Sequence, residues 1–365
     1  MQTRMNSSSE IIKIRLQNQQ IACSGFKTAK ELVGFMGAMQ AQDYAMVKWA
    51  VGIRLPDATI HSVEDSINHG ELIRTHLLRP TWHLVSANDI HWILELTAPQ
   101  IKSKMKSRHK ELELNDAIIA KCCKIIENTL TEHQSLSREE LIAELTRHQI
   151  KTSDNNRAAH ILLSAELDGL ICNGANNENK TTYSLLRKRV PKTKPFDRNE
   201  AIAALTEKYF LSHGPATTDD FIWWSGLPVK DARSGIEMLN NHLIPETIHS
   251  QRYWLHQSAA HFETTENLAC LLPAYDEFII SYKDRSAILA SPEQGKVISS
   301  NGLFKPVILV NGQVAGLWKR TIKKNKAIIE TELFRPLRSG ERELVEQSAR
   351  LFARFIAKEA EIRFN

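Results

Sequence analysis

The sequence has few of the residues that would indicate a disulfide-stabilised protein or a cysteine-based metal site. Only five cysteines occur in 365 residues, they are scattered, and no two form a Cys-x-x-Cys pair. Their odd number and spacing exclude a disulfide framework and a cysteine zinc site, so we expect reduced thiols. The 14 histidines do not pair with Cys or Asp at metal-ligand spacing either. The sequence therefore predicts no metal site and no cofactor.

Several common enzyme motifs are also absent. The chain has no Gly-x-x-x-x-Gly-Lys-Ser/Thr loop, no Gly-x-Gly-x-x-Gly, no His-Glu-x-x-His and no Gly-x-Ser-x-Gly. These patterns place backbone N–H groups, metal ligands or a nucleophile where a particular reaction needs them. Their absence argues against NTPases, dinucleotide-dependent oxidoreductases and zinc hydrolases.

Long apolar runs are missing as well. No stretch approaches the roughly 18 apolar residues that a membrane-spanning helix needs. The polar segment 1–15 lacks the apolar centre of a signal peptide. We therefore expect a cytoplasmic protein that has no contact with a membrane.

The composition is that of a globular protein with a small excess of positive charge. Hydrophobic residues make up 42% and charged residues 24% of the chain, and its length predicts two or three domains. The 47 Lys and Arg residues outnumber the 42 Asp and Glu residues, which gives a net charge of +5. Basic residues concentrate in three runs, at 102–110, 187–194 and 319–326. Because phosphates attract clustered Lys and Arg side chains, the runs favour a nucleic-acid partner. We expect the protein to be associated with the nucleoid when it is bound to DNA.

The order of helices, turns and strands predicts an α+β fold that is mostly α and repeats one kind of unit. In its middle part, a capping box at Ser137 and Glu140 opens a short helix, and a second helix follows a polar turn. Two short apolar segments then flank the turn-rich stretch 173–180, which would form the wing of a winged helix. We predict four units: a first winged-helix-like unit at 1–115, a second winged-helix unit at 116–192, a third winged-helix-like unit at 193–260, and a C-terminal β-rich segment with a closing helix at 261–365.

A hairpin is predicted near the end of the chain. Segments 306–310 and 313–318 flank Asn311 and Gly312, and Asn-Gly between apolar segments is the strongest short-range signal for a hairpin. A further strand at 327–334 is predicted to pair with it. The long apolar-faced helix that follows is predicted to close the chain.

Five segments resemble a known family in the same order along the chain. They are 40–43 (QAQD), 74–75 with 79–85 (RT and RPTWHLV), 213–217 with 224–227 (HGPAT and WSGL), 272–278 with 282–285 (LPAYDEF and YKDR), and 310–313 (VNGQ). Each segment alone is weak, but together they are similar to the winged-helix DNA glycosylases typified by AlkZ and YcaQ over nearly the whole length. The resemblance implies tandem winged helices that frame a concave DNA-binding surface. It also implies excision of N-alkylated purines, including bases joined in interstrand crosslinks.

The resemblance implies catalytic and DNA-binding residues as well. The family's catalytic pattern is Gln, an intervening residue, then Gln or Asp, and Gln40 and Gln42 match it. Pro80 stands where the family frequently has Gly, and Pro fixes a φ angle that Gly leaves free. The family uses a β-hairpin that reaches toward the lesion, and the Asn-Gly hairpin is our candidate, against the alternative of a plain structural hairpin. The DNA contacts expected on this basis are Arg79, His83, Asn311, Gly312, Trp318, Lys319 and Arg320.

The chemistry of two amides limits what the Gln pair can do. Residues two apart share one side of an extended segment but not of a helix, so Gln40 and Gln42 share a cleft only if the preceding helix ends near Met39. An amide is no general base, but it can hold a water molecule. This suffices where alkylation has made the purine cationic, because the base then leaves without an external acid and the sugar oxocarbenium needs only electrostatic support. The motif contains no Lys, so we expect a monofunctional glycosylase.

Other roles are open for several of these residues. Gln40 and Gln42 could instead cap a helix or bind the backbone, and Asp43 is a rival candidate for activating the water. Trp223 and Trp224 are predicted to pack in the core. The whole chain could also be a non-enzymatic winged-helix DNA-binding protein or transcriptional regulator, or a scaffold for protein contacts. We expect a monomer, because a single lesion in double-stranded DNA has no two-fold symmetry to match.

Overall fold

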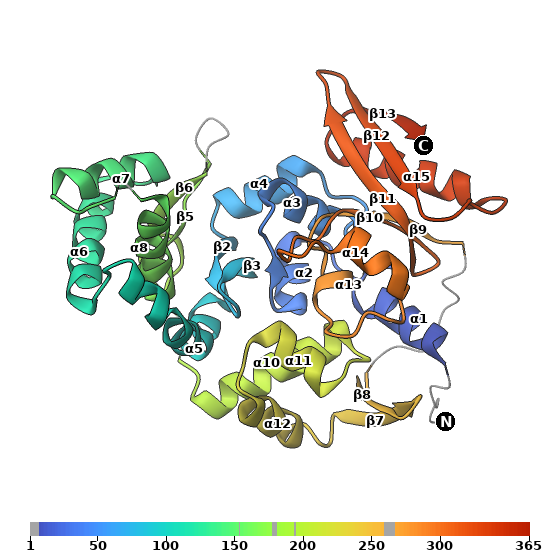
Figure 1. Cartoon of the computed structure of the whole chain (residues 1–365), viewed down its shortest axis with the longest axis horizontal. Helices are drawn as coiled ribbons and strands as arrows, with labels where there is room; N and C mark the ends of the chain where they lie inside the picture. Colours follow the sequence, from blue (N-terminus) through green and yellow to red (C-terminus); the bar gives the residue numbers. More distant parts are fainter. Residues whose placement is uncertain (1–6, 153, 177–180, 193–194, 259–266) are drawn as a thin grey trace.

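The chain folds into a mixed α and β structure in which helices predominate, in agreement with the predicted fold class (Figure 1). The computed structural model describes residues 7–152, 154–176, 181–192, 195–258 and 267–365. Lys194 and the predicted wing tip at 177–180 lie outside these residues. No helix in the described part of the chain combines the length and the apolar character that crossing a bilayer requires.

The N-terminal part combines helices with a small antiparallel sheet of order β1-β3-β2. Helix α2 begins at a capping box between Thr28 and Glu31. It ends at Gly37, whose φ of 79° lies in the region that favours glycine. The elements are α1 (Ser8–Asn18), α2 (Ala29–Met36), β1 (Met39–Gln40), α3 (Tyr44–Gly52), α4 (Ile60–Asn68), β2 (Leu72–Leu77) and β3 (Thr81–Ser86).

The long helix α5 (Ile90–Glu111) leads to a lobe with a hydrophobic core of its own, seen at the left of Figure 1. Leu141, Ile161 and Leu185 belong to that core. The winged-helix interpretation of this lobe remains a prediction. Its elements are α6 (Asp116–Glu132), β4 (Leu136–Ser137), α7 (Arg138–Arg147), α8 (Asn155–Leu167), β5 (Ile171–Asn173), β6 (Thr182–Leu185) and α9 (Leu186–Arg189), with the strand order β4-β6-β5.

The next segment forms the lower part of the molecule in Figure 1. Its buried residues, such as Leu205 and Trp224, share a core with Ile73 of β2 and Ile93 of α5. This part is therefore packed against the N-terminal sheet and not tethered to it by a linker alone. Its elements are α10 (Arg198–His213), α11 (Thr218–Ser225), α12 (Val229–Met238) and the antiparallel hairpin of β7 (Leu243–Ile248) and β8 (Gln251–His256).

The C-terminal part is built on a sheet of order β13-β12-β11-β10-β9. The predicted closing helix is present as α15, but it is not the last element, because the chain continues into β13, which pairs in parallel with β12. The elements are β9 (Ala269–Leu272), α13 (Glu277–Ile280), the short 3-10 helix Ser291–Glu293, α14 (Gln294–Val297), β10 (Val307–Val310), β11 (Gln313–Ile322), β12 (Lys326–Leu333), α15 (Glu341–Phe355) and β13 (Glu359–Phe364).

The largest hydrophobic core joins the two ends of the chain. It contains residues of α2 and α3 together with residues of β9, β10 and α15. The ring of Trp49 on α3 lies 5.2 Å from that of Phe352 and 5.3 Å from that of Phe355. The first and fourth of the predicted units therefore share one core, and this contact fixes α3 and the segment before it against the C-terminal sheet.

Candidate active site

The segment that carries Gln40 and Gln42 is extended, as a shared cleft requires. Helix α2 ends at Met36, and Met39 and Gln40 form the short strand β1. Gln40 pairs with His83 of β3, and the N–H of the following Ala41 donates to the carbonyl of Trp82 at 2.7 Å. This pairing ties the motif to the edge of the sheet before α3 begins at residue 44.

The Gln40 side chain is buried and held by two donors. It is 5% exposed. Its Oε1 accepts from Arg79 Nη2 at 3.4 Å and from Thr81 Oγ1 at 3.3 Å. Since a carbonyl oxygen has two lone pairs, both acceptor positions are occupied. The amide Nε2, which has no hydrogen-bond partner among the described residues, is left as the group that can bind a further molecule.

A buried carboxylate fixes the backbone of Gln40. Glu277 of α13 is 2% exposed, and its Oε1 accepts from the Gln40 N–H. Its Oε2 accepts from Trp224 Nε1 at 3.1 Å and from the Ser281 hydroxyl, and lies 3.5 Å from His213 Nε2. Burial alone raises the pKa of Glu277, but its contacts with His213, the Ser281 hydroxyl and the Gln40 N–H lower it to about 2. Glu277 is therefore ionised at neutral pH, and it is a positioning residue for the motif.

Gln42 differs from Gln40 because its side chain is exposed. Within the described residues its amide has no hydrogen-bond partner, so both its donor and its acceptor are available to solvent. Next to it, Asp43 caps α3, with Oδ1 accepting from the N–H groups of Ala45 and Met46 at 3.0 Å each. Capping thus accounts for Asp43, the rival candidate, without a catalytic role.

The residue between the two glutamines is held by an arginine. Nε of Arg74 donates to the carbonyl of Ala41 at 3.0 Å. The guanidinium lies 4.0 Å from the ring centroid of Trp82 and 5.3 Å from that of Tyr44, within the range of cation–π attraction. Burial lowers the pKa of Arg74. Arg74 therefore holds the backbone between the two glutamines, as Glu277 holds that of Gln40.

An exposed tryptophan between two arginines lies beside Gln40. Trp223 is 39% exposed, so the prediction that it packs in the core is wrong, whereas Trp224 is fully buried as predicted. The guanidinium of Arg79, which binds Gln40, lies 5.3 Å from the Trp223 ring, and that of Arg285 lies 5.4 Å from it. The Trp223 indole N–H donates to the carbonyl of Ile280 at 2.7 Å. This hydrogen bond uses the edge of the ring, so the ring face stays available for stacking.

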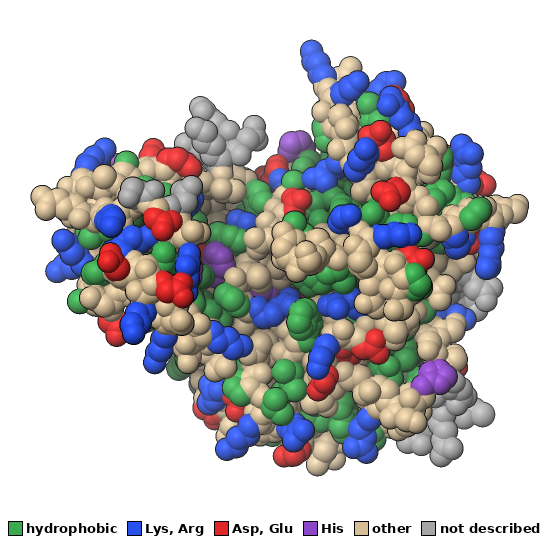
Figure 2. Space-filling model, in the orientation of Figure 1, with side chains coloured by type: hydrophobic (Ala, Val, Ile, Leu, Met, Phe, Trp, Pro, Cys, Tyr) green, Lys and Arg blue, Asp and Glu red, His purple; other side chains and the backbone are tan. Residues whose placement is uncertain are grey.

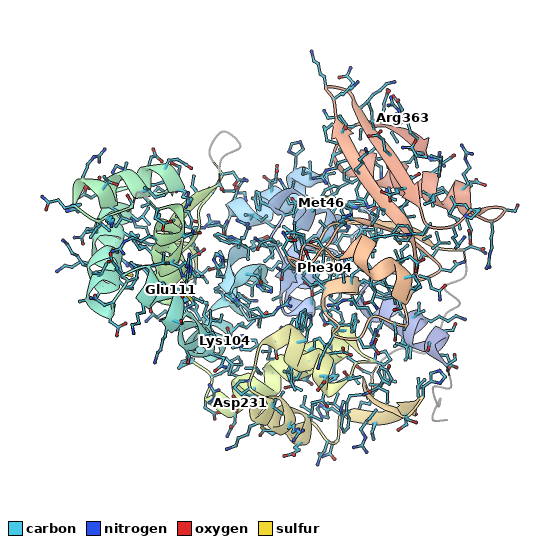
Figure 3. All side chains as sticks on the ribbon, in the orientation of Figure 1. Met46, Lys104, Glu111, Asp231, Phe304 and Arg363 are labelled. Atoms are coloured by element: carbon cyan, nitrogen blue, oxygen red, sulfur yellow. The ribbon has the colours of Figure 1, made fainter. Side chains whose placement is uncertain are left out.

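These groups belong to one cationic and aromatic face of the molecule. Arg285 also lies 5.1 Å from the ring of Phe304, which Figure 3 labels at the centre of the view. Burial lowers the pKa of Arg285 to about 10, so it stays charged at neutral pH. Figure 2 shows Lys and Arg side chains at the centre of this face and a recess between it and the lobe of α6 to α8. Such a face can hold phosphates and stack planar rings at the same place.

The Asn-Gly hairpin forms as predicted, but its tip does not project. Asn311 and Gly312 have φ of 49° and 79°, the positive values that a tight turn of this kind requires. A Cβ added at Gly312 would lie 2.0 Å from Cγ2 of Ile12, so the tip is packed against α1. The Asn311 side chain accepts from the N–H of Leu268 at 3.1 Å. Gly312 is buried and Asn311 is exposed, so this packing supports the structural alternative and argues against a DNA contact at Gly312.

The remaining predicted hairpin residues fall into two groups. Trp318 is 2% exposed, and its indole N–H donates to the carbonyl of Leu272 at 2.8 Å, so it is a core residue and not a surface contact. Lys319 is exposed. Arg320 reaches the N-terminus of α3, where Nη1 lies 2.6 Å from Met46 Sδ, a residue labelled in Figure 3. The structure therefore brings Arg320, but not Trp318, to the neighbourhood of Gln42 and Asp43.

His83 is the other predicted DNA contact that the structure buries. It is 1% exposed, in β3 opposite Gln40 and Thr75, and Nδ1 lies 2.9 Å from the Thr81 carbonyl. Burial and the nearby positive charge of Arg79 lower its pKa to about 3, so the ring is neutral. His83 is therefore a buried, neutral residue that supports the sheet beneath Gln40, and the prediction that it contacts DNA is corrected.

Glu277, Trp223 and Arg285 were not expected at the site from the sequence. The three residues lie in or directly beside motifs quoted above, so their position in the resemblance was the available signal. Their roles depend on α11 and α13 lying against β1, which no local pattern reveals. Among the described residues, the group of side chains that could hold a metal ion lies elsewhere, on α10 and beside β7 and β8.

Comparison with known proteins identifies the family. The model of the AlkZ-like DNA glycosylase family matches residues 33–355. An interstrand DNA cross-link repair glycosylase of Streptomyces sahachiroi is 22% identical over 328 residues, which is 85% of this chain and 87% of that protein. The solved structure of the Streptomyces sahachiroi DNA glycosylase AlkZ superimposes with a TM-score of 0.81, at 18% identity, with each chain covered completely. The chain belongs to the AlkZ-like DNA glycosylase family.

Proposed function

We propose that this chain is a monofunctional DNA glycosylase that hydrolyses the N-glycosidic bond of cationic N-alkylated purines, with the attacking water held by Gln40 and Gln42. The observation that carries the proposal is the state of the Gln40 amide. Arg79 and Thr81 occupy its carbonyl, and no group among the described residues binds its Nε2, two residues before the exposed Gln42.

The hydrogen bonds of Gln40 and Gln42 suggest which amide donates to the attacking water and which accepts from it. With its carbonyl occupied, Gln40 donates an N–H to the oxygen of the water. Gln42, which is exposed, supplies a carbonyl acceptor for one of the water protons. The water is then oriented but not deprotonated, since an amide has no useful basicity.

A water that is oriented but not deprotonated is sufficient only where the base is already a good leaving group. Alkylation at N7 or N3 makes the purine cationic, so the C1′–N9 bond breaks as the electron pair returns to the base. Water adds its oxygen to C1′ and loses a proton to solvent, which leaves an abasic sugar and the free alkylated purine. The DNA phosphates and the oriented amide dipoles stabilise the oxocarbenium in between.

The ion pair of the lysine on α3 supports a monofunctional enzyme. A lyase needs a Lys to form a Schiff base with the sugar. Near the motif, Lys48 is 7% exposed and its ammonium pairs with Glu64. We therefore expect abasic product without strand cleavage by the protein.

Activity on interstrand crosslinks is proposed from the Streptomyces relative, whose name states that it repairs them. A crosslink through purine N7 also makes the base cationic, so the same chemistry applies. The Trp223 ring is 39% exposed, and an exposed ring can accept a base that is still joined to the second strand.

We expect the protein to release 7-methylguanine from duplex DNA and to leave neutral guanine in place, because only the alkylated base departs unaided. The measurement is alkaline cleavage of the abasic product in an end-labelled duplex, with an unmodified duplex as control. DNA binding with no strand breaks above background would contradict the proposal and favour a non-enzymatic winged-helix regulator. Breaks before alkali treatment would contradict the monofunctional part.

Replacing Trp223 by alanine is expected to weaken binding of lesion-containing duplex about 10- to 100-fold, since a ring stacked on a base contributes about 1–3 kcal/mol. Fluorescence anisotropy with a labelled duplex measures the effect. Trp223→Phe keeps an aromatic face between Arg79 and Arg285 and is expected to retain most of the affinity. Equal affinity of Trp223→Ala and wild type would show that the exposed ring has no contact with DNA.

A further inference from the structure

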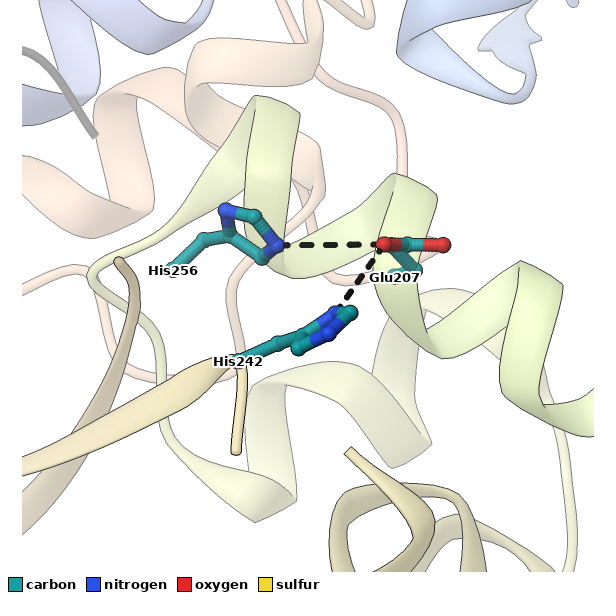
Figure 4. A group of neighbouring side chains, drawn as sticks. All are labelled: Glu207, His242 and His256. Carbon is teal, nitrogen blue, oxygen red and sulfur yellow. Dashed lines mark hydrogen bonds and ion pairs between the residues drawn. The ribbon is translucent and has the colours of Figure 1, made fainter. Parts of the chain in front are cut away.

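Three potential metal ligands meet in the lower part of the molecule, away from the Gln motif. Glu207 lies on α10, His242 directly precedes β7, and His256 is the last residue of β8 (Figure 4). One donor atom from each of the three lies within 4.8 Å of the other two. Oε1 of Glu207 lies 3.4 Å from Nδ1 of His242 and 3.9 Å from Nε2 of His256.

The backbone holds the two imidazoles at the open end of the hairpin. Leu243 and His256 are opposite each other in the β7–β8 register, and the N–H of Gln257 donates to the carbonyl of His242 at 2.8 Å. The two rings are 5.9 Å apart at 83°. Both therefore face α10 from strands that already pair, and little backbone movement is needed to bring their nitrogens together.

The side chain of His256 gives a second, independent indication that a ligand binds at this group. It is 7% exposed, and its Nε2, which points toward Glu207 in Figure 4, is buried without a hydrogen-bond partner among the described residues. A buried polar atom without a partner is costly, and native proteins contain few of them. On the other side of the ring, the hydroxyl oxygen of Ser258 lies 2.7 Å from Nδ1. The backbone N–H of Ser258 also lies 3.3 Å from Nδ1. A metal ion at Nε2 selects the tautomer in which Nδ1–H donates to the Ser258 hydroxyl, which is the usual second-sphere support of a metal-bound imidazole.

The donor set determines the kind of ion. Two imidazole nitrogens and one carboxylate suit Zn²⁺ and similar transition-metal ions, whereas Mg²⁺ and Ca²⁺ prefer oxygen ligands. Tetrahedral zinc with bonds of about 2.0–2.1 Å holds its ligand atoms about 3.3 Å apart. The two distances to Glu207, 3.4 and 3.9 Å, are near this value, and the ligand atoms of the two histidines lie within 4.8 Å of each other. The side chains of His242 and Glu207 are 47% and 45% exposed, which gives the ion a way in and leaves room for a water as fourth ligand.

We propose that Glu207, His242 and His256 form a structural zinc site that ties the β7–β8 hairpin to α10. The ion replaces a loose pair of His–Glu contacts by three bonds that join two strands and a helix. The site is independent of the Gln motif and of the proposed glycosylase activity. It was not expected from the sequence, because Glu207 meets the two histidines only where α10 packs against the β7–β8 hairpin.

Metal binding to the purified full chain, stripped with chelator, tests the proposal directly. Zinc should bind with a single site in calorimetry, and Co²⁺ should give the intense visible bands of a tetrahedral complex, which Zn²⁺ then removes. Mg²⁺ should not bind. Because Cys23 is an exposed thiol, the titrations use the Cys23→Ser variant. Zinc should also raise the thermal midpoint of this protein.

Matched variants separate this site from adventitious binding. His242→Ala and Glu207→Gln are expected to weaken Zn²⁺ more than tenfold and to remove the thermal shift, and Ser258→Ala to weaken it about tenfold. The control is His148→Ala, directly after α7, whose imidazole lies 3.3 Å from Glu144 with no third potential ligand among the described residues, and it should bind as the parent does. Absence of zinc binding in the parent, or unchanged affinity in both His242→Ala and His256→Ala, would overturn the proposal.

Discussion

Replacing Gln42 by alanine is expected to slow release of 7-methylguanine about 100- to 1,000-fold while duplex binding stays near the wild-type level. The loss of one group that orients the reacting atoms in the transition state costs about this much in other enzymes. Gln42 is exposed and has no hydrogen-bond partner among the described residues, so its removal should leave the fold intact. Single-turnover rates with saturating enzyme measure the chemical step apart from binding.

Gln40→Ala is expected to reduce the rate similarly, but it also removes the acceptor for Arg79 and Thr81. Its stability therefore has to be measured beside its activity. Gln313→Ala is the matched control, because Gln313 is an exposed glutamine of β11 outside the site. Wild-type rates in both Gln40→Ala and Gln42→Ala would contradict the proposed mechanism, and Asp43 would then be the next residue to test.

Replacing Asp276 by alanine is expected to destabilise the protein by about 3–5 kcal/mol, because it leaves a buried guanidinium without its counter-ion. Asp276 and Arg54 form a two-pronged ion pair, with both N–O distances at 2.8 Å and neither side chain exposed. Arg54 also binds the carbonyls of Gln19 and Ala50. The pair thus joins the end of α1, α3 and the segment that carries Glu277. Urea unfolding should show a lower midpoint with an unchanged slope.

The exposed pair of Asp219 and Lys283 is the control for this prediction. Its atoms are also 2.8 Å apart, but the side chains are 64% and 61% exposed. Solvent screens such a pair, so Asp219→Ala should lower the midpoint far less than Asp276→Ala. The double variant Arg54→Ala with Asp276→Ala should lose less than the sum of the two single losses, since each partner alone is an unpaired buried charge. Equal midpoints for Asp219→Ala and Asp276→Ala would refute the role given to the buried pair.

Local patterns were sufficient for elements whose causes lie within a few residues. The positive φ angles of Asn311 and Gly312 form the turn between β10 and β11, and the capping box of Ser137 and Glu140 begins α7. The extended path through Gln40 likewise follows from the end of α2 at Gly37. By contrast, β13 was not foreseen although its residues alternate between charged and apolar, because it pairs with β12 across the intervening α15.

In the candidate site, too, some features were predicted from local patterns and others were not. The motifs identified the family and both glutamines, but they did not predict that Gln40 is buried and Gln42 exposed. Trp223 and Trp224 are neighbours with the same chemistry. Successive residues on a helix point about 100° apart, so one ring meets Glu277 in the core and the other faces outward between two arginines.

By itself, the sequence determined the family, the local elements and the chemical type of the Gln pair, because these depend on residue identity and short spacing. Only the tertiary structure decided which predicted contacts reach the surface. Trp318 and His83 are covered and the hairpin tip is packed on α1, while Glu277, Arg285 and Trp223 are brought to Gln40 from distant segments. The physical reason is that burial and proximity across the chain arise from packing of whole elements, which no short stretch of residues encodes.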